Sequence, residues 1–531
     1  MSTRRSLPAI PVVPRLPWLS RASRIGAEIY PPSTVKDRVA KSHRTYLGIT
    51  MDVSVIKTFG AVAAEDEPVL NYFVETSAVS EIGDGEKFLV LGRKGSGKTA
   101  LVRYFNEKTQ DGLISVALNL RGYPWALHAK RSDSDVDESE KYEASWRYLI
   151  VVEFAQVVAK RLTGASKWTD EAKSLTEFFV QNYGGIDVSL GDFLRPAELS
   201  LSKASFEPQL FGSKLGAITL ERKEREGGLA RELNLLSDLI LDNALYLCNR
   251  EGIEKTLIHF DELDQGMARF DVPRQQMLTG LILATRSINR EAAKRSVKLK
   301  SVVYLRTDLW NEINFSDKNK ITTTSVLDIS WDEKSLLKVV NSRVKSMGGY
   351  DWDTLHDGGT MRGRQQKFSY IVARSFLRPR DIISFLNILL AKTKERINTK
   401  GGATVFTNKD IVDSRREYST YLRLELHDEI SPHWSEWEDA LKAISKMGRL
   451  SFARVSFESR YPESVGVNNK RNSEQALETL YEYSVLGAYR ASGYGGKKWV
   501  FRYSEPGEAW DSSGSLFKVH LGLKEHLALK E

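Results

Sequence analysis

The chain has 531 residues, with 77 Lys and Arg against 69 Asp and Glu, and a formal net charge of +8. This length allows two to four domains with separate cores. The sequence holds no apolar run long enough to span a bilayer, so we expect a cytoplasmic protein without membrane contact. Its one cysteine, Cys248, excludes an internal disulfide and fits a reducing compartment.

The positive charge is concentrated at the amino terminus. Residues 1–50 hold nine basic and two acidic side chains, whereas residues 51–531 hold 68 and 67, so the folded part is nearly neutral. The first 50 residues are rich in arginine and proline, which favours a disordered basic extension. They also faintly resemble an organelle transit peptide, and Met51 leaves an upstream misassigned start codon as a third interpretation.

The most specific pattern is Gly-Arg-Lys-Gly-Ser-Gly-Lys-Thr at residues 92–99. It follows the apolar run 88–91 and precedes the helix-like residues 100–105, which is the strand, loop and helix order of a phosphate-binding loop. Further upstream, we expect a helix that presents Leu70, Phe73 and Val74 on one face. The sequence therefore predicts that the chain binds a nucleoside triphosphate.

Each residue type in the loop has a physical role. Glycines lack a Cβ, so Gly92, Gly95 and Gly97 can adopt positive φ and turn their N–H groups toward phosphates at a helix N-terminus. Lys98 is expected to reach the β- and γ-phosphates, and Thr99 to hold Mg²⁺. We therefore predict ATP and Mg²⁺ as cofactors, bound by Gly92, Gly95, Ser96, Gly97, Lys98, Thr99 and Ala100.

A second site lies at residues 257–262, a mostly apolar run that ends in two acids. Such a run is typical of a buried parallel strand, and ligands collect at the carboxyl ends of such strands. We expect Asp261 to hold the magnesium and Glu262 to deprotonate the attacking water. His259 is interpreted as a core residue, whereas Asp264 is either part of the acidic cluster or a solvated turn acid.

Strands alternate with helices through residue 331, which predicts a parallel α/β sheet in a P-loop ATPase domain over 51–331. Residues 184–230 mix glycine, serine and short apolar runs, and we interpret them as an insertion. The expected elements are strands at 88–91, 113–118, 256–261 and 302–305, and helices at 146–161, 231–249 and 274–296.

Beyond residue 331 helical patterns dominate. They predict a helical lid domain over 332–430 and, after a further change of pattern, a winged-helix domain over 431–531. The fold class is thus α/β, a parallel-sheet P-loop NTPase domain followed by an α-helical lid and a C-terminal winged helix. The expected elements are helices at 332–347, 379–395, 408–429, 434–447 and 472–484, and strands at 486–490 and 499–503 around the glycine-rich turn 492–496.

With these pieces in order, the chain resembles an AAA+/STAND-type P-loop ATPase of the origin-recognition-like branch. The phrases 88–99, Arg306-Thr307-Asp308 and Leu377-Arg378-Pro379-Arg380-Asp381 are also similar to bacterial ATPases found in anti-phage defence loci.

The resemblance implies a γ-phosphate sensor at Arg306, with Thr307 as second choice, and a lid arginine at Arg378 or Arg380. Fixed guanidinium groups there would stabilise developing charge on the phosphate. Residues 315–320 contain lysines but no arginine finger, which favours a STAND-like switch.

The winged helix is the candidate for contact with duplex DNA. Residues 441–531 carry fourteen basic and ten acidic side chains, a small excess for a DNA-binding surface. DNA contact and internal packing therefore both stay open, while Trp499, Phe501 and Tyr503 are expected in the domain's core. The candidate DNA-contacting residues are Lys470, Arg471, Lys497, Lys498 and Arg502.

The sequence thus predicts a Mg-dependent switch ATPase that acts through a partner protein in anti-phage defence or another DNA-associated response. The alternative is an origin-recognition-like initiator or loader that grips DNA. A small-molecule kinase is disfavoured, because paired acids and a large C-terminal half suit hydrolysis coupled to shape change. Whether the chain forms a homo-oligomer is left open.

Overall fold

The structure is a computed structural model of the chain. The basic extension 1–50 and residues 193–228 of the expected insertion lie outside the described residues. The structure describes residues 51–108, 112–121, 123, 125, 128, 138–162, 167–189, 191–192, 229–253, 255–264, 270–491 and 497–531.

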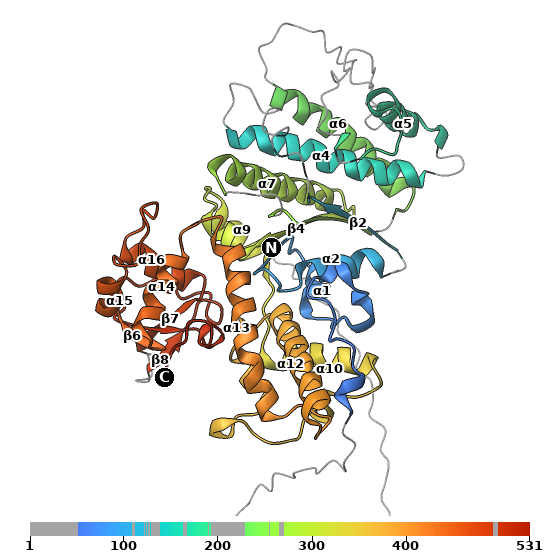
Figure 1. Cartoon of the computed structure of the whole chain (residues 1–531). Coiled ribbons are helices and arrows are strands. Elements are labelled where there is room, and N and C mark those ends of the chain that lie inside the picture. The colour runs from blue at the N-terminus through green and yellow to red at the C-terminus, as the bar shows by residue number, and fades with distance from the viewer. Residues whose placement is uncertain are drawn as a thin grey trace, which may run out of the picture. The chain divides into compact units, whose positions relative to one another are not determined.

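A five-stranded parallel sheet organises residues 89–328, as the sequence predicts (Figure 1). Its strand order is β2-β3-β4-β1-β5, so β4 lies between the strand that enters the phosphate loop and the strand that ends in acids. In the register Gly92 pairs with Arg306 and Asn119 with Asp261. Four functional strand ends therefore meet at one edge. The strands are β1 (Leu89–Gly92), β2 (Leu113–Asn119), β3 (Lys255–Asp261), β4 (Leu299–Arg306) and β5 (Val326–Asp328).

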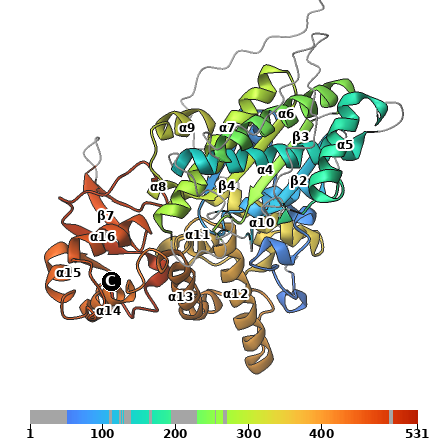
Figure 2. The ribbon, with the colours of Figure 1, turned by 90° about the horizontal axis from the view of Figure 1, so that it is seen from above.

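Helices cover both faces of this sheet. Along β4, Val303 and Leu305 belong to one apolar core while Val302 and Tyr304 belong to the other, because successive strand residues point to opposite faces. Figure 1 shows α4, α6 and α7 on one side of the sheet and α1 and α2 on the other, and Figure 2 shows α4, α6 and α7 close together from above. The helices are α1 (Ser77–Gly83), α2 (Lys98–Glu107), α4 (Glu138–Arg161), α5 (Asp170–Tyr183), α6 (Leu229–Arg250), α7 (Val272–Lys294), α8 (Thr307–Glu312) and α9 (Lys318–Ser325).

The helix expected around residues 70–74 is wrong. Residues 69–72 form a single 3₁₀ turn, Phe73 is extended, and α1 begins only at Ser77. Distant contacts fix this conformation, because Arg343 binds Glu67 at 2.7 Å and lies over the ring of Tyr72. Local apolar spacing could not reveal a partner about 270 residues away. Among the described residues, the labelled 3₁₀ turns are η1 (Val53–Val55), η2 (Ala64–Asp66), η3 (Val69–Tyr72), η6 (Trp352–Leu355), η7 (Arg362–Arg364) and η8 (Leu521–Leu523).

After the sheet, the chain is helical and then forms a small second sheet. The antiparallel hairpin β7–β8 is the expected wing, and the sheet order is β6-β9-β7-β8. The elements are α10 (Glu333–Ser346), α11 (Lys367–Val372), α12 (Pro379–Lys400), α13 (Asn408–Ile430), α14 (Glu438–Met447), β6 (Ser451–Ala453), α15 (Arg454–Arg460), α16 (Ser473–Glu482), β7 (Leu486–Ala491), β8 (Lys497–Val500) and β9 (Leu516–Val519).

One continuous apolar cluster joins the helical lid to the winged helix. It contains Leu389 of α12, Tyr418 of α13 and Phe517 of β9, and it also takes in Met51 and Phe59 from the start of the described chain. A shared core favours movement of these two parts as one body. Among the described helices, none is long and apolar enough to cross a membrane.

Close packing of α4 against α7 generates a stability prediction. A Cβ at Gly280 would stand 2.7 Å from the Cβ of Tyr142 and 2.8 Å from the backbone nitrogen of Glu143. Gly280→Ala should therefore lower the free energy of unfolding by about 1–3 kcal/mol, measured in urea. The control is Gly83→Ala, whose Cβ would meet only the flexible Lys255 amine at 3.6 Å. Equal midpoints for the two variants would contradict this packing argument.

Candidate nucleotide-binding site

The loop 92–99 runs from the end of β1 to the first turn of α2. Gly95 and Gly97 have φ of +78° and +101°, as the pattern predicts. Gly92 does not have positive φ, so that expectation is wrong for it. Its missing Cβ matters for a different reason, because a Cβ there would come within 2.3 Å of the Ser96 hydroxyl.

Lys98 lies at the centre of the loop. Its ammonium donates to the carbonyls of Gly92 and Arg93 at 2.8 and 3.1 Å. Burial lowers the pKa of Lys98, and the nearby carboxylates of Asp264 and Asp261 oppose that shift. A buried ammonium group inside a glycine-rich loop, with acidic side chains nearby, is suited to binding phosphate.

Thr99 meets Asp261, which is 162 residues away in sequence. The Thr99 hydroxyl and the backbone N–H of Glu262 lie near the Asp261 carboxylate and favour its charged form. Burial raises the pKa of Asp261, because desolvation outweighs these two groups and the charge of Lys98. A threonine hydroxyl beside a carboxylate supplies hard oxygen ligands of the kind that Mg²⁺ takes, so these two residues fit the implied metal.

Glu262 follows directly in a left-handed conformation, with φ of +58°. It is 5% exposed, and the polar side chains that face it are Asn119 at the end of β2 and Glu65 from the segment before the sheet. Burial, together with Glu65, raises the pKa of Glu262 to about 7. A non-glycine residue held at positive φ costs about 1–3 kcal/mol and is often found at functional sites.

Arg306 ends β4, one strand from the phosphate loop. Its guanidinium bonds Asp308 at 2.6 and 3.0 Å and Asp264 at 3.2 Å, so Asp264 belongs to the acidic cluster. Burial disfavours the charge, but Asp308 and Asp264 outweigh it and raise the pKa of Arg306. Thr307, the second choice, begins α8. His259 lies in the core, paired with Tyr304 at 2.9 Å.

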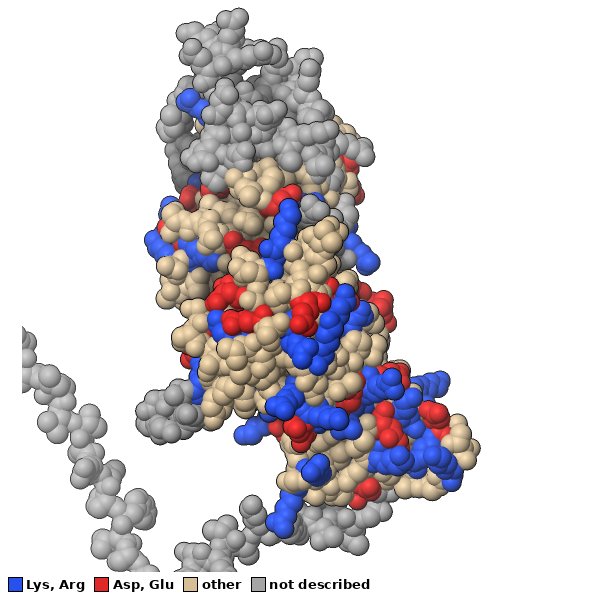
Figure 3. Space-filling model, turned by 60° about the vertical axis from the view of Figure 1, so that its left-hand side comes forward, with Lys and Arg blue, Asp and Glu red and all other residues tan. Residues whose placement is uncertain are grey.

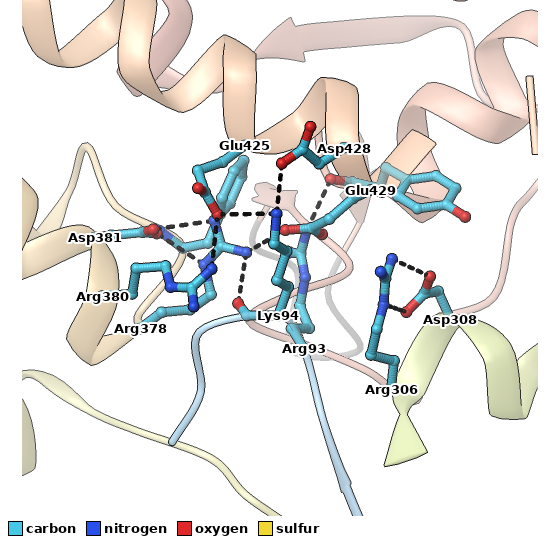
Figure 4. A network of polar contacts seen from close by, with 12 residues as sticks. Arg93, Lys94, Arg306, Asp308, Arg378, Arg380, Asp381, Glu425, Asp428 and Glu429 are labelled. Carbon is cyan, nitrogen blue, oxygen red and sulfur yellow. Dashed lines mark hydrogen bonds and ion pairs between the residues drawn. The ribbon is translucent and has the colours of Figure 1, made fainter. Parts of the chain in front are cut away.

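Arg378 and Arg380, the two arginines of the helical lid, lie beside the phosphate loop on the side of the lid helices (Figure 4). Arg378 is 2% exposed and donates to the Lys94 carbonyl at 2.9 Å, to Asp381 at 3.0 Å and to Glu429. The side chain of Arg380 packs against Gly95, where a Cβ would come within 2.7 Å of it. Both arginines thus contact the loop directly.

Sequence reasoning missed the acids of α13 that bind the loop's own cations (Figure 4). Arg93 pairs with Glu429 at 3.1 Å, and Lys94 pairs with Asp428 at 2.7 Å. Glu425 pairs with Arg380 at 3.2 Å. These partners are separated by more than 330 residues for Arg93 and Lys94, and no local spacing signals them.

An apolar pocket adjoins the loop on its α2 side. Ser96, Gly97 and Ala100 form one part of its wall, and the Trp331 indole donates to the Ser96 carbonyl at 2.8 Å. The remaining wall includes Val69, Tyr72, Phe73, Leu101 and Val339.

Most of the candidate DNA-contacting side chains have partners within the chain. Arg471 donates to the His433 carbonyl at 3.0 Å and lies over the ring of Trp434. Lys498 pairs with Glu505 at 2.8 Å, and Arg502 pairs with Glu482 at 3.1 Å.

The remaining two candidates are Lys470 and Lys497. Lys470 is exposed, and the side chain of Lys497 lies outside the described residues. On the face that Figure 3 shows, the basic and acidic side chains of the described residues are interspersed. The described part of the wing therefore offers little free positive charge.

One family model and several solved structures are similar to parts or most of the chain. Residues 334–427 match the family described as the FunZ-associated C-terminal helical domain. No curated protein matches the chain.

Three solved structures resemble the chain over most of its length. The Orc1 protein of Aeropyrum pernix, solved with DNA, is 12% identical over 90% of this chain and 95% of its own, with a TM-score of 0.33. A Walker-type ATPase of Pyrococcus abyssi is 13% identical over 85% and 98%, with a TM-score of 0.37. Cdc6p from Pyrobaculum aerophilum is 13% identical over 91% and 98%, with a TM-score of 0.28. Such distant likeness says nothing of activity or partners.

His433 generates a pH prediction. It pairs with Glu312 at 2.6 Å and contacts Asp308, the partner of Arg306. Burial lowers the pKa of His433, but these two acids outweigh it and raise the value to about 9 from 6.5. The imidazolium therefore stabilises the fold below pH 6.5, and this contribution, about 3 kcal/mol at most, is lost as pH rises through 9.

Unfolding in urea at pH 6 and pH 9.5 measures this effect. We expect the wild-type chain to lose more stability than His433→Gln over that interval. The control is His526→Gln, since burial and the charge of Arg423 lower the pKa of His526 and outweigh the opposing charge of Glu438. An identical pH dependence in wild type and His433→Gln would show that the imidazolium does not hold this charge.

Proposed function

We propose that the chain binds Mg-ATP and hydrolyses it. The observation that carries this proposal is the meeting of Lys98, Thr99 and Asp261 at one sheet edge, with Glu262 directly after. Bound Mg²⁺ would neutralise phosphate charge beside Thr99 and Asp261. Lys98 suits the terminal phosphates, and the small apolar pocket beside the loop, about 90 Å³ in volume, is proposed to take only an edge of the nucleobase.

Glu262 is the proposed general base. Its pKa of about 7 leaves a substantial share of carboxylate at neutral pH, and that carboxylate is basic enough to take a proton from water. Asn119 is placed to orient it. Arg306 lies on the strand between the two motifs, and Arg380 packs against Gly95, so both are proposed to stabilise charge on the terminal phosphate. Arg378 is the proposed link between loop and lid.

The ion pairs between the loop and α13 support a switch rather than a simple hydrolase. A bound triphosphate adds negative charge beside Lys94 and Arg380, and it therefore competes with Glu425 for them. Since α13 shares its core with the winged helix, a change in this helix would extend to the C-terminal part.

The proposed role in the cell is based on the similarity of residues 88–99, 306–308 and 377–381 to bacterial ATPases found in anti-phage defence loci. We place the ATPase in the cytoplasm, in anti-phage defence or another DNA-associated response, acting through a protein partner. The second candidate is an initiator or loader, favoured by the hairpin β7–β8 with its preceding helices. Fluorescence anisotropy with duplex DNA separates the two, because salt-sensitive binding that Lys470→Glu abolishes would favour the loader.

If Glu262 is the general base, its replacement should slow ATP hydrolysis without a matching loss of ATP binding. Glu262→Gln should retain ATP affinity within about threefold and slow hydrolysis about 100-fold or more, because the amide accepts no proton. Lys98→Ala should lose both. Phosphate release and binding of a fluorescent ATP analogue measure the two effects. Wild-type turnover by Glu262→Gln would refute the base.

The competition for cations predicts the effect of one acid of α13. Glu425→Gln should bind ATP about fivefold more tightly, because Lys94 and Arg380 are released toward the phosphates. The control is Glu417→Gln on the same helix, whose carboxylate is 55% exposed and pairs with Lys392 at 3.4 Å. Unchanged or weaker ATP affinity in Glu425→Gln would exclude the competition.

A further inference from the structure

A second cavity lies at the opposite edge of the parallel sheet. Its volume is about 700 Å³, and it opens at the amino ends of the strands, with Phe88 before β1, Lys255 at the start of β3 and Leu299 at the start of β4. Seven residue steps along β4 separate Leu299 from Arg306, about 23 Å at the rise of a strand. The cavity is therefore separate from the nucleotide site.

Positive charge gathers in this cavity. Residues 51–531 are nearly neutral as a whole, with 68 basic and 67 acidic side chains. Against that background, the described lining residues include six basic groups and only two acids, Asp84 and Glu86. The basic groups are Lys255, Arg286, Arg290, Lys298, Lys300 and Lys320.

Three of the six cations are held by the fold. Lys255 pairs with Asp84 at 2.7 Å, and Arg286 pairs with Asp317 at 2.6 Å. The ammonium of Lys300 donates to the backbone carbonyls of Ile82 and Gly85 at 2.8 and 2.7 Å. These contacts fix the positions of charge at the floor of the cavity.

The other three cations are exposed at the rim. Among the described residues, no side chain forms an ion pair or hydrogen bond with the charged groups of Arg290, Lys298 and Lys320, and Thr324 bonds only the backbone carbonyl of Lys320. Burial is the main cause that lowers the pKa of Lys300 to about 8, with a further contribution from Lys255, while the acids Asp84, Glu81 and Glu86 oppose the shift. An anion in the cavity would likewise favour the charged ammonium of Lys300.

We propose that the cavity binds a small anion that carries two or more phosphate groups. Its volume falls within the range of about 300–1,000 Å³ usual for small-ligand sites. A concave site of this size does not match the convex surface of duplex DNA. Its one aromatic lining residue, among those described, is Phe88, which is only 4% exposed and offers no stacking surface for the bases of a single strand.

Calorimetry with inorganic tripolyphosphate tests the proposal on the full chain. Saturating Mg-ADP is added first, so that the phosphate loop is occupied. We expect the wild-type chain to bind tripolyphosphate, and the triple variant Arg290→Glu, Lys298→Glu, Lys320→Glu to bind it at least tenfold more weakly. Because all three side chains are exposed, the variant should fold.

The matched control changes one arginine and two lysines that are exposed on described helices away from the cavity, Arg416→Glu, Lys173→Glu and Lys400→Glu. Its affinity for tripolyphosphate should stay within about twofold of wild type. Equal weakening in both triple variants would reduce the effect to overall charge and overturn the site. Absence of binding by the wild-type chain would overturn it as well.

Two further titrations distinguish the source of the phosphates. A single-stranded and a duplex oligonucleotide are titrated under the same conditions. Binding of an oligonucleotide that depends on Arg290, Lys298 and Lys320, without binding of tripolyphosphate, would replace the small ligand by nucleic acid and refute the proposal. The ATPase rate of the triple variant should remain that of wild type, so failure of this site and failure of the proposed ATPase give different results.

Discussion

The arrangement of the site depends on the ion pairs made by the buried carboxylate of Glu429. It lies between Arg93 of the phosphate loop and Arg378 at the start of α12, and these two guanidinium groups lower the pKa of Glu429 to about 2, although burial alone would raise it. Removal of one partner from a buried ion pair is strongly destabilising, because the remaining charge cannot be solvated. The phosphate loop and the lid helices α12 and α13 are therefore held in one geometry by charge (Figure 4).

This constraint gives the nucleotide site two walls of different origin. The sheet supplies Asp261 and Arg306 through its register, and rigid strands leave these side chains little freedom. Lys98 comes from the first residue of α2, at the end of the loop that leaves β1. The lid supplies Arg380 through an ion-pair network with Glu425 and Lys94, which we propose that bound phosphate perturbs. Side chains that the sheet holds in fixed positions suit catalysis. Side chains held by exchangeable ion pairs suit the transmission of a conformational change to the C-terminal part. The amino edge of the sheet, about 23 Å along β4 from Arg306, carries a separate concentration of positive charge.

Much of the α/β domain could be predicted because its signals are local. The apolar runs at 88–91 and 256–261 form strands, and Gly95 and Gly97 adopt the positive φ that their residue type allows. Predictions were wrong or incomplete where distant contacts decide. Arg343 holds residues 67–72 out of a regular helix, and close contact with Ser96 rather than backbone conformation explains Gly92.

The sequence by itself determined the phosphate loop, the acids after β3 and the alternation of strands and helices, because each depends on residues adjacent in the chain. Only the tertiary structure decided that Glu425, Asp428 and Glu429 bind the loop's cations, and that Lys298 and Lys320 share a cavity. These groups meet because parallel strands and packed helices bring distant residues together. The residues next to a charged side chain in the sequence do not indicate which opposite charge it will contact.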